Sequence, residues 1–310
     1  MPRMRLSSPR LTNISFELAL EEFIEILKAK GRSTVTIEDY QWNCTRFYSL
    51  YPHFPDVGQM KRGASIYLTE KISPYTYNLR LTYNKCFFRY CVEQGYLSEN
   101  PMLLFKVKRT EPRIVQHSSD VLIKLLQQPD LKTYVGLRDY AMLLLTLDTG
   151  IRPSELRKLM PEDFDPNKGL IFIPAEISKV RKSRTLPIQP TTISFLRRLQ
   201  ACKPDSWTNA PIFCNNEGTM MLAWAWQARL KLYSRSIGQR IRPYDLRHDF
   251  ALLYLKNGGN VFTLQKMMGH STLEMTRRYI DIDSSELKRM ASIASPLNTL
   301  ITTKKRLGKI

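Results

Sequence analysis

The fold is decided by residues 242–282, which read RPYDLRHDFALLYLKNGGNVFTLQKMMGHSTLEMTRRYIDI. Arg247 follows a Pro-Tyr-Asp-Leu turn and opens an apolar helix, and Gly269-His270 ends a second helical run. Tyr279 lies on a third short helix, nine residues after that histidine. An arginine fork fits phosphate oxygens, an imidazole donates to them or moves a proton, and a tyrosine hydroxyl beside cations can act as a nucleophile. These residue types at this spacing predict a site for phosphoryl chemistry.

The composition indicates a two-domain protein that binds a polyanion. The chain has 310 residues, enough for two domains of about 150 residues each. Its 47 lysines and arginines against 28 acidic residues give a net charge of +19, which is typical of nucleic-acid-binding proteins. The sequence contains no apolar run long enough to span a membrane and no signal-peptide core, so a membrane partner is not expected.

The cysteines and histidines argue against a disulfide framework and against a metal centre. The five cysteines include no C-x-x-C pair and are odd in number, which indicates reduced thiols in a cytoplasmic protein. The four histidines are scattered along the chain. The sequence therefore predicts no metal site.

A second motif, TGIRPSEL at residues 149–156, lies near the middle of the chain. Gly150 is a helix stop, and Pro153 suits the first turn of the next helix. Arg152 is therefore expected at a turn before a helix N-terminus, where a phosphate binds readily. Taken alone, Arg152 could be a surface arginine, and Glu155 could be a first-turn acid favoured by the helix dipole.

Together the two motifs resemble those of the tyrosine recombinases, also called the phage integrase family. T-G-x-R-x-S-E-L resembles the first catalytic box of the family, and L-R-H, M-G-H-S and the tyrosine nine residues after the histidine resemble the second. The resemblance assigns Arg152 and Arg247 to the two catalytic arginines. It assigns His270 to the histidine or tryptophan position, Tyr279 to the nucleophile, and Glu155 to an acid that supports the site.

The resemblance implies transesterification of duplex DNA without a metal or another cofactor. Tyr279 would attack the scissile phosphorus to give a 3′-phosphotyrosyl link and a free 5′-hydroxyl, while fixed cations stabilise the negative transition state. Tyr244 stands where the family usually has a histidine. Its hydroxyl can hydrogen-bond the phosphate, but it cannot act as an imidazolium, so the task of deprotonating the nucleophile is open.

A β-hairpin with a basic tip is predicted between residues 169 and 188. GLIFIP at 169–174 and SRTLPI at 183–188 alternate like strands on either side of AEISKVRK. In the family such a hairpin carries a catalytic lysine to the DNA. Matching K-x-x-K-x-R-x-x-P assigns that role to Lys179, with Lys182 as the alternative, and Lys182 and Arg184 are otherwise expected to contact DNA. A further short strand is expected at residues 212–214.

Four helices are predicted in the first hundred residues. They fall at about residues 15–30, 36–51 and 60–70, and from 74 to a stop at Gly95. Their periodic aromatic stripes favour core packing over base stacking. Residues 106–116, KVKRTEPRIVQ, are predicted to be a linker that lies along the DNA backbone through cations that include Lys106, Lys108 and Arg109.

The predicted fold class is mainly α, with an N-terminal four-helix core-binding (SAM-like) bundle and an α+β catalytic domain that holds a small antiparallel β-hairpin or sheet. The expected segments are a flexible basic arm at 1–14, the core-binding domain at 15–105, the linker at 106–116, the catalytic domain at 117–292 and a C-terminal tail at 293–310. The resemblance implies that the tail docks on a neighbouring protomer. It also implies a tetramer on paired DNA sites, a Holliday junction, and accessory DNA-bending or directionality proteins as further candidate partners.

Two alternative functions fit parts of the sequence. A type IB topoisomerase shares the tyrosine chemistry. A chain length that fits two domains and the residues of the T-G-x-R-x-S-E-L and M-G-H-S motifs favour a recombinase. A non-enzymatic regulator could use residues 261–280 as a helix-turn-helix. Such a regulator has no need for all five candidate catalytic residues together. The sequence leaves open the target site and the choice among integration, excision and resolution.

Overall fold

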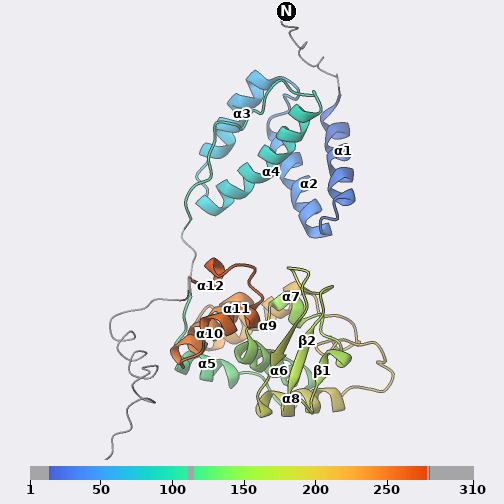
Figure 1. The fold of residues 1–310 in the computed structure, drawn as a ribbon, viewed down its shortest axis with the longest axis vertical. Coiled ribbons are helices and arrows are strands. Elements are labelled where there is room, and N and C mark those ends of the chain that lie inside the picture. The colour runs from blue at the N-terminus through green and yellow to red at the C-terminus, as the bar shows by residue number, and fades with distance from the viewer. Residues whose placement is uncertain (1–13, 111–114, 278, 280–310) are drawn as a thin grey trace, which may run out of the picture. The chain divides into compact units, whose positions relative to one another are not determined.

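The computed structural model describes residues 14–110, 115–277 and 279, and it divides into two units between residues 111 and 112 (Figure 1). Helices dominate both units, and the strands form one small antiparallel sheet within the described part of the second unit. The predicted fold class, mainly helical with a small antiparallel sheet, is confirmed. No helix in the described ranges is both long and apolar enough to cross a lipid bilayer.

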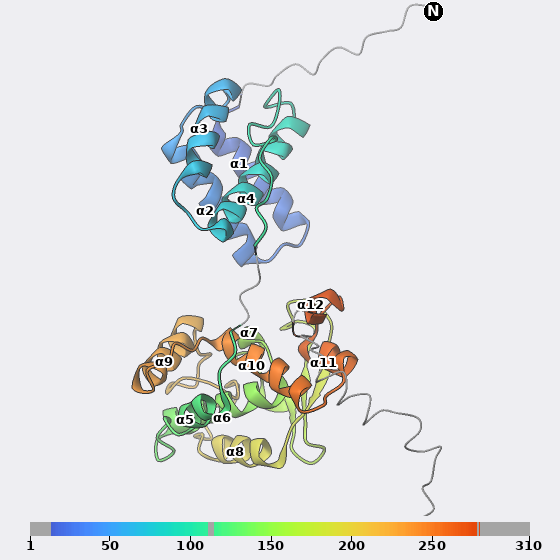
Figure 2. The same ribbon diagram turned by 90° about the vertical axis from the view of Figure 1, so that its left-hand side faces the viewer.

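The described part of the first unit contains four long helices, α1 (Phe16–Ala29), α2 (Thr34–Leu50), α3 (Val57–Thr69) and α4 (Pro74–Glu93) (Figure 2). Each helix begins after a side chain that accepts a hydrogen bond from the backbone of its first turn; these residues are Ser15, Ser33, Asp56 and Ser73. The aromatic rings of Phe47, Phe87 and Phe88 are at most 1% exposed. The aromatic stripes therefore form a core, as predicted.

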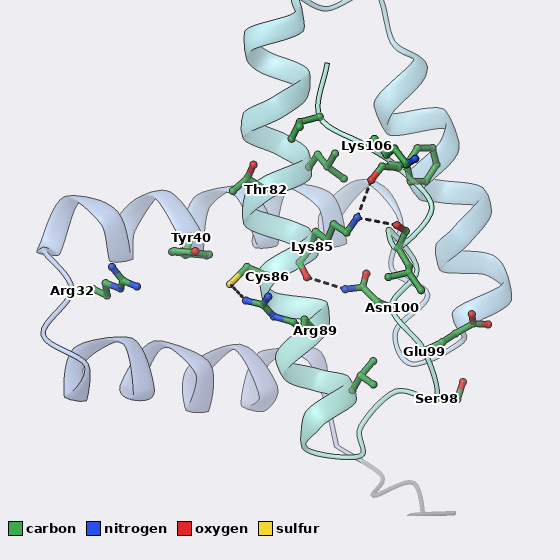
Figure 3. Close-up of a pocket in the computed structure, with 15 residues that line it drawn as sticks. Arg32, Tyr40, Thr82, Lys85, Cys86, Arg89, Ser98, Glu99, Asn100 and Lys106 are labelled. Atoms are coloured by element: carbon green, nitrogen blue, oxygen red, sulfur yellow. Dashed lines mark hydrogen bonds between the residues drawn. The ribbon is translucent and has the colours of Figure 1, made fainter. Parts of the chain in front are cut away.

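The chain after α4 folds back along that helix (Figure 3). The Lys85 ammonium donates to two backbone carbonyls of the returning segment, each at 2.8 Å, and the Asn100 amide donates to the Lys85 carbonyl at 2.9 Å. Asn78 on α4 exchanges two further 2.8 Å hydrogen bonds with the backbone of Lys108. The start of the predicted linker is thus fixed on α4 within the first unit.

The second unit packs its helices around a small sheet. The helices are α5 (Ser119–Leu126), α6 (Tyr134–Thr149), α7 (Pro153–Leu156), η1 (Pro161–Asp163), α8 (Pro190–Ala201), α9 (Ala223–Ser236), α10 (Pro243–Lys256), α11 (Val261–Met268) and α12 (Glu274–Arg277). Because α6 is buried along most of its length, it serves as the central helix and packs against α5, α8 and α10. α11 lies beside α10 and β3, so it joins the helical part of the unit to the sheet.

The sheet has the order β1 (Phe164–Asp165), β2 (Leu170–Ile173) and β3 (Arg184–Pro187), and both pairings are antiparallel. The β2–β3 hairpin lies where it is predicted, with Phe172 opposite Thr185. The expected strand at residues 212–214 is wrong, because only Cys214 pairs, in an isolated bridge with Met220. That apolar run reads as a strand, but its side chains are buried in the core of the unit without forming a ladder.

Candidate active site

Arg152 lies at the junction between two helices. α6 ends at Gly150, whose φ of 63° is left-handed, and a Cβ at this position would come within 2.3 Å of the Phe250 ring. Arg152 then precedes α7, and Pro153 occupies the first turn of that helix. The predicted helix stop at Gly150 and helix start at Pro153 are confirmed. Arg152, which lies between them, is only 5% exposed.

Three arginine side chains meet at the C-terminal end of α11. Three successive backbone carbonyls there each accept a hydrogen bond from a different guanidinium: Met267 from Arg184 at 2.9 Å, Met268 from Arg247 at 2.6 Å, and Gly269 from Arg152 at 2.6 Å. The last carbonyls of a helix lack partners within the helix and carry partial negative charge, so cations are favourable at this end. One helix end thereby gathers arginines that are far apart in the sequence.

Glu155 holds two of these guanidiniums. Its buried carboxylate accepts two hydrogen bonds from Arg184, at 2.6 and 3.0 Å, one from the Arg152 side chain at 3.0 Å and one from the Arg152 backbone at 3.1 Å. Burial alone would raise the pKa of Glu155, but the hydrogen bonds and charges of Arg184 and Arg152 hold that pKa below its ordinary value. Arg184 is predicted to contact DNA, and the structure places its guanidinium on Glu155 and on α11.

Arg247 is buried between the two helix ends. Its guanidinium donates to the carbonyls of Gly150 and Met268, and it lies 3.3 Å from Nε2 of His270. Burial, and then the charge of Arg152, lower the pKa of Arg247 to about 9, so Arg247 stays protonated at neutral pH. Three guanidiniums thus gather around one carboxylate, and the excess of positive charge suits a phosphate.

His270 and Tyr279 lie beside this arginine cluster. Nδ1 of His270 lies 2.8 Å from the Thr276 hydroxyl, while Nε2 faces Arg247. The His270 and Tyr279 rings are nearly parallel, with centroids 6.4 Å apart, and Tyr279 is 4% exposed. The predicted residues Arg152, Arg247, His270 and Tyr279 therefore come together within the second unit.

His248 is a site residue that the sequence analysis did not identify. Its Nδ1 lies 2.6 Å from the Tyr279 hydroxyl, and the two ring centroids are 5.6 Å apart. Its position in the L-R-H triplet, directly after Arg247, could have marked His248 as a candidate site residue. Sequence spacing alone does not show that this histidine meets a residue thirty-one positions later, because the contact depends on how α10 packs.

The structure leaves several predicted site residues exposed. Lys179 and Lys182 lie in the connection between β2 and β3, and both side chains are exposed. Tyr244 is 50% exposed and lines a cavity of about 380 Å³ together with His248. Within the described residues, neither Lys179 nor Tyr244 hydrogen-bonds to the arginine cluster. The exposed predicted DNA contacts Lys106, Lys108 and Arg109 belong to the first unit.

The described part of the chain offers no cluster of three or more histidine, cysteine, aspartate or glutamate side chains that could hold a metal ion. The site is instead built from guanidinium, imidazole and phenol groups. Such groups can bind an oxyanion, move a proton and attack phosphorus, which are the steps that phosphoryl transfer needs.

Comparisons with known proteins place this site in a family. A family model for the phage integrase family matches residues 117–286. The tyrosine recombinase XerC of Thermodesulfovibrio yellowstonii is 28% identical over 307 residues, which cover 93% of this chain and 99% of that protein. XerC of Syntrophus aciditrophicus is 30% identical over 237 residues, covering 73% of this chain and 76% of that one.

Solved structures share the fold. A lambda integrase dimer bound to a core site has a TM-score of 0.69 at 17% identity, and the match covers 96% of this chain and 99% of that chain. The XerH site-specific recombinase in a post-cleavage complex with difH substrate has a TM-score of 0.68 at 22% identity, with coverages of 88% and 83%. The chain belongs to the phage integrase family. It is a site-specific tyrosine recombinase, an enzyme that transfers DNA strands.

The ion pair at Glu155 leads to a prediction about stability. Glu155→Gln should lower the free energy of unfolding at pH 7 by about 3–5 kcal/mol, because it leaves buried guanidiniums without their counter-charge. A carboxylate whose pKa is lowered on folding stabilises the fold above its unfolded pKa, and that contribution is lost as the pH falls through the lower folded value. The gap between wild type and variant should therefore narrow below about pH 4.5.

Urea unfolding followed by tryptophan fluorescence measures this gap, since Trp226 is buried in the same unit. Glu162→Gln, at an exposed carboxylate of this unit, is the matched control and should change little. A gap between wild type and Glu155→Gln that stays constant from pH 7 to pH 3.5 would show that the carboxylate charge does not hold the cluster.

Proposed function

We propose that the chain cleaves duplex DNA by direct attack of Tyr279 on a scissile phosphorus. The observation that supports this proposal is the meeting of one phenol, two imidazoles and three guanidiniums in one unit of one chain. Arg152 and Arg247 would hold the non-bridging oxygens, because each has N–H groups beyond those that bond to carbonyls and to Glu155. The fixed cations would stabilise charge that develops in the transition state.

The reaction is a pair of transesterifications. As the Tyr279 oxygen bonds to phosphorus, the bond to the 5′ oxygen breaks, which leaves a 3′-phosphotyrosyl link and a free 5′-hydroxyl. The departing oxygen needs a proton, for which Lys179 is the proposed general acid. A 5′-hydroxyl from a second duplex then reverses the step, so exchange of both strand pairs passes through a Holliday junction. The phosphodiester energy is kept in the phosphotyrosine, so no cofactor is needed.

Duplex DNA is the proposed substrate and main partner. The net charge of +19 supports it, as do related proteins whose structures were solved as complexes with core-site and difH DNA. Lys106, Lys108 and Arg109 are exposed cations suited to the backbone. We place the protein in the cytoplasm because its cysteines are free thiols within the described residues. Assembly as a tetramer on paired sites, with accessory DNA-bending or directionality proteins, belongs to the same proposal.

The two alternative functions are less well supported. A helix-turn-helix regulator gives no reason to bury Arg152, Arg247 and Tyr279 around one charged cluster at the cost of desolvation. A type IB topoisomerase would relax supercoiled plasmid without pairing sites. The recombinase relatives match at least two thirds of this chain, and they favour strand exchange between sites.

The nucleophile can be tested with Tyr279→Phe. This variant should bind duplex DNA as tightly as wild type and form no covalent adduct on a nicked suicide substrate, because phenylalanine has no oxygen to attack phosphorus. The adduct is measured as a shifted protein band on a denaturing gel. Tyr254→Phe is the control and should still form the adduct. Residual adduct with Tyr279→Phe, together with its loss in Tyr254→Phe, would move the nucleophile to Tyr254.

The general acid can be tested by changing the leaving group. Lys179→Ala should slow cleavage by about 100-fold or more, in the range expected for a missing general acid. A substrate with sulfur in place of the bridging 5′ oxygen should restore the rate, because a thiolate leaves without protonation. Lys182→Ala is the matched control from the same loop. Rescue of Lys182→Ala alone would assign the general acid to Lys182.

A further inference from the structure

We propose that His248 is the general base that takes the proton from Tyr279, an inference that rests on the proposed role of Tyr279 as the nucleophile. Nδ1 of His248 lies 2.6 Å from the Tyr279 hydroxyl oxygen, which is within direct proton-transfer distance. The ring centroids are 5.6 Å apart and the ring planes are tilted by 45°. This arrangement lets a ring nitrogen meet the hydroxyl edge-on instead of stacking on the phenol face.

The helix that carries Arg247 explains why its neighbour reaches the phenol. Consecutive residues on an α-helix point about 100° apart, because a turn holds 3.6 residues. Arg247 is directed at the carbonyls of Gly150 and Met268, so His248 is turned toward a different side of α10. That side meets Tyr279, and one helix thereby presents a phosphate ligand and a proton acceptor on adjacent positions.

The other candidate bases are engaged elsewhere or are chemically unsuited. Nδ1 of His270 lies at the Thr276 hydroxyl and its Nε2 at Arg247, so both ring nitrogens already have partners suited to holding the ring in place. Tyr244 occupies the position at which the family usually has a histidine, but a neutral phenol accepts a proton poorly. His248 is thus the imidazole whose nitrogen is directed at the nucleophile.

The charged side chains around His248 have partners of their own. His248 lines the cavity of about 380 Å³ that is also lined by Arg157, Arg242, Tyr244 and Asp245. The carboxylate of Asp245 is occupied by Arg242, to which it bonds at 2.9 Å, and Arg157 donates to the carbonyl of Met221. The nearest charged side chains of this wall are therefore held by other partners, and Nδ1 of His248 lies at the Tyr279 hydroxyl.

The proton balance of the step is complete. The Tyr279 proton passes to Nδ1 of His248 as the phenol oxygen bonds to phosphorus, and the 5′ oxygen leaves with a proton from the separate general acid. In the reverse direction a 5′-hydroxyl returns its proton to the deprotonated general acid as its oxygen bonds to phosphorus. The bond between phosphorus and the phenol oxygen breaks, and the imidazolium returns its proton to that oxygen. Base and acid are distinct groups, so each can be removed without the other.

His248→Asn is the sharpest test, because an asparagine oxygen can replace Nδ1 as a hydrogen-bond acceptor but cannot carry the proton away. Adduct formation on a nicked duplex is measured in single turnover from pH 6 to pH 9.5. We expect a loss of about 100-fold at pH 7 that shrinks as the pH rises, because hydroxide in the solvent can then remove the phenol proton without the imidazole. A wild-type rate, or a loss of the same factor at every pH, would reduce His248 to a positioning residue and overturn the proposal.

Imidazole rescue provides a second and independent readout. His248→Ala leaves space next to an existing cavity, so free imidazole should restore adduct formation in proportion to its concentration. His53→Ala, in the first unit, is the matched control and should neither lose activity nor respond to imidazole. Equal DNA affinity and an unchanged urea midpoint show that the variants are folded. Failure of imidazole to raise the rate of a folded His248→Ala would contradict the proposal.

Measuring Tyr279→Phe and His248→Asn side by side separates the role of His248 from the role of Tyr279 as the nucleophile. An adduct that persists in Tyr279→Phe would overturn the assignment of the nucleophile, and with it any role for His248. An adduct that is absent in Tyr279→Phe while His248→Asn reacts like wild type would overturn the role of His248 alone.

Discussion

The second unit depends on one interaction, the docking of three guanidiniums on the last carbonyls of α11. Arg184, Arg247 and Arg152 each bond to a different one of three successive carbonyls. A helix end supplies these acceptors because its final carbonyls have no partners within the helix. Glu155 also bonds to two of the three guanidiniums, those of Arg152 and Arg184. The motif around residue 152, the hairpin and the stretch after residue 242 are thereby joined at one point.

The arginine cluster is buried and still carries an excess of positive charge. Burial lowers the pKa of Arg247 to about 9, yet the group remains charged at neutral pH. A single carboxylate offsets only part of the charge of the cluster, and a phosphate can supply the rest. Guanidiniums that are held by carbonyls and by Glu155 need little reorganisation to stabilise charge on the oxygens of a phosphate. α10 carries two residues of this region, because its Arg247 belongs to the arginine cluster and its His248 lies at the Tyr279 hydroxyl.

Much of the fold and of the candidate site could be predicted from the sequence, because the motifs combine residue type with spacing. Helix stops at glycine and starts at proline placed Arg152 correctly, and alternation placed the hairpin. Other features could not be predicted, because they depend on packing between distant parts of the chain. The strand expected at residues 212–214 failed because an apolar run signals burial and not pairing. A basic residue after a hairpin tip suggests a DNA contact, which stays a prediction for Arg184, but sequence spacing does not reveal its bond to Glu155, a partner twenty-nine positions away. His248 was missed because only packing brings it to Tyr279.

The arginine cluster and Tyr279 lie in the same unit of one chain, and we propose that a working site takes both from that chain. Mixing Arg247→Ala with Tyr279→Phe on a nicked duplex tests this claim most directly, with covalent adduct as the readout and each variant mixed with wild type as the control. Both control mixtures should form adduct, and the mixture of the two variants should form none. Adduct recovered from the two inactive variants together would show that the phenol and the guanidiniums of a working site come from different chains.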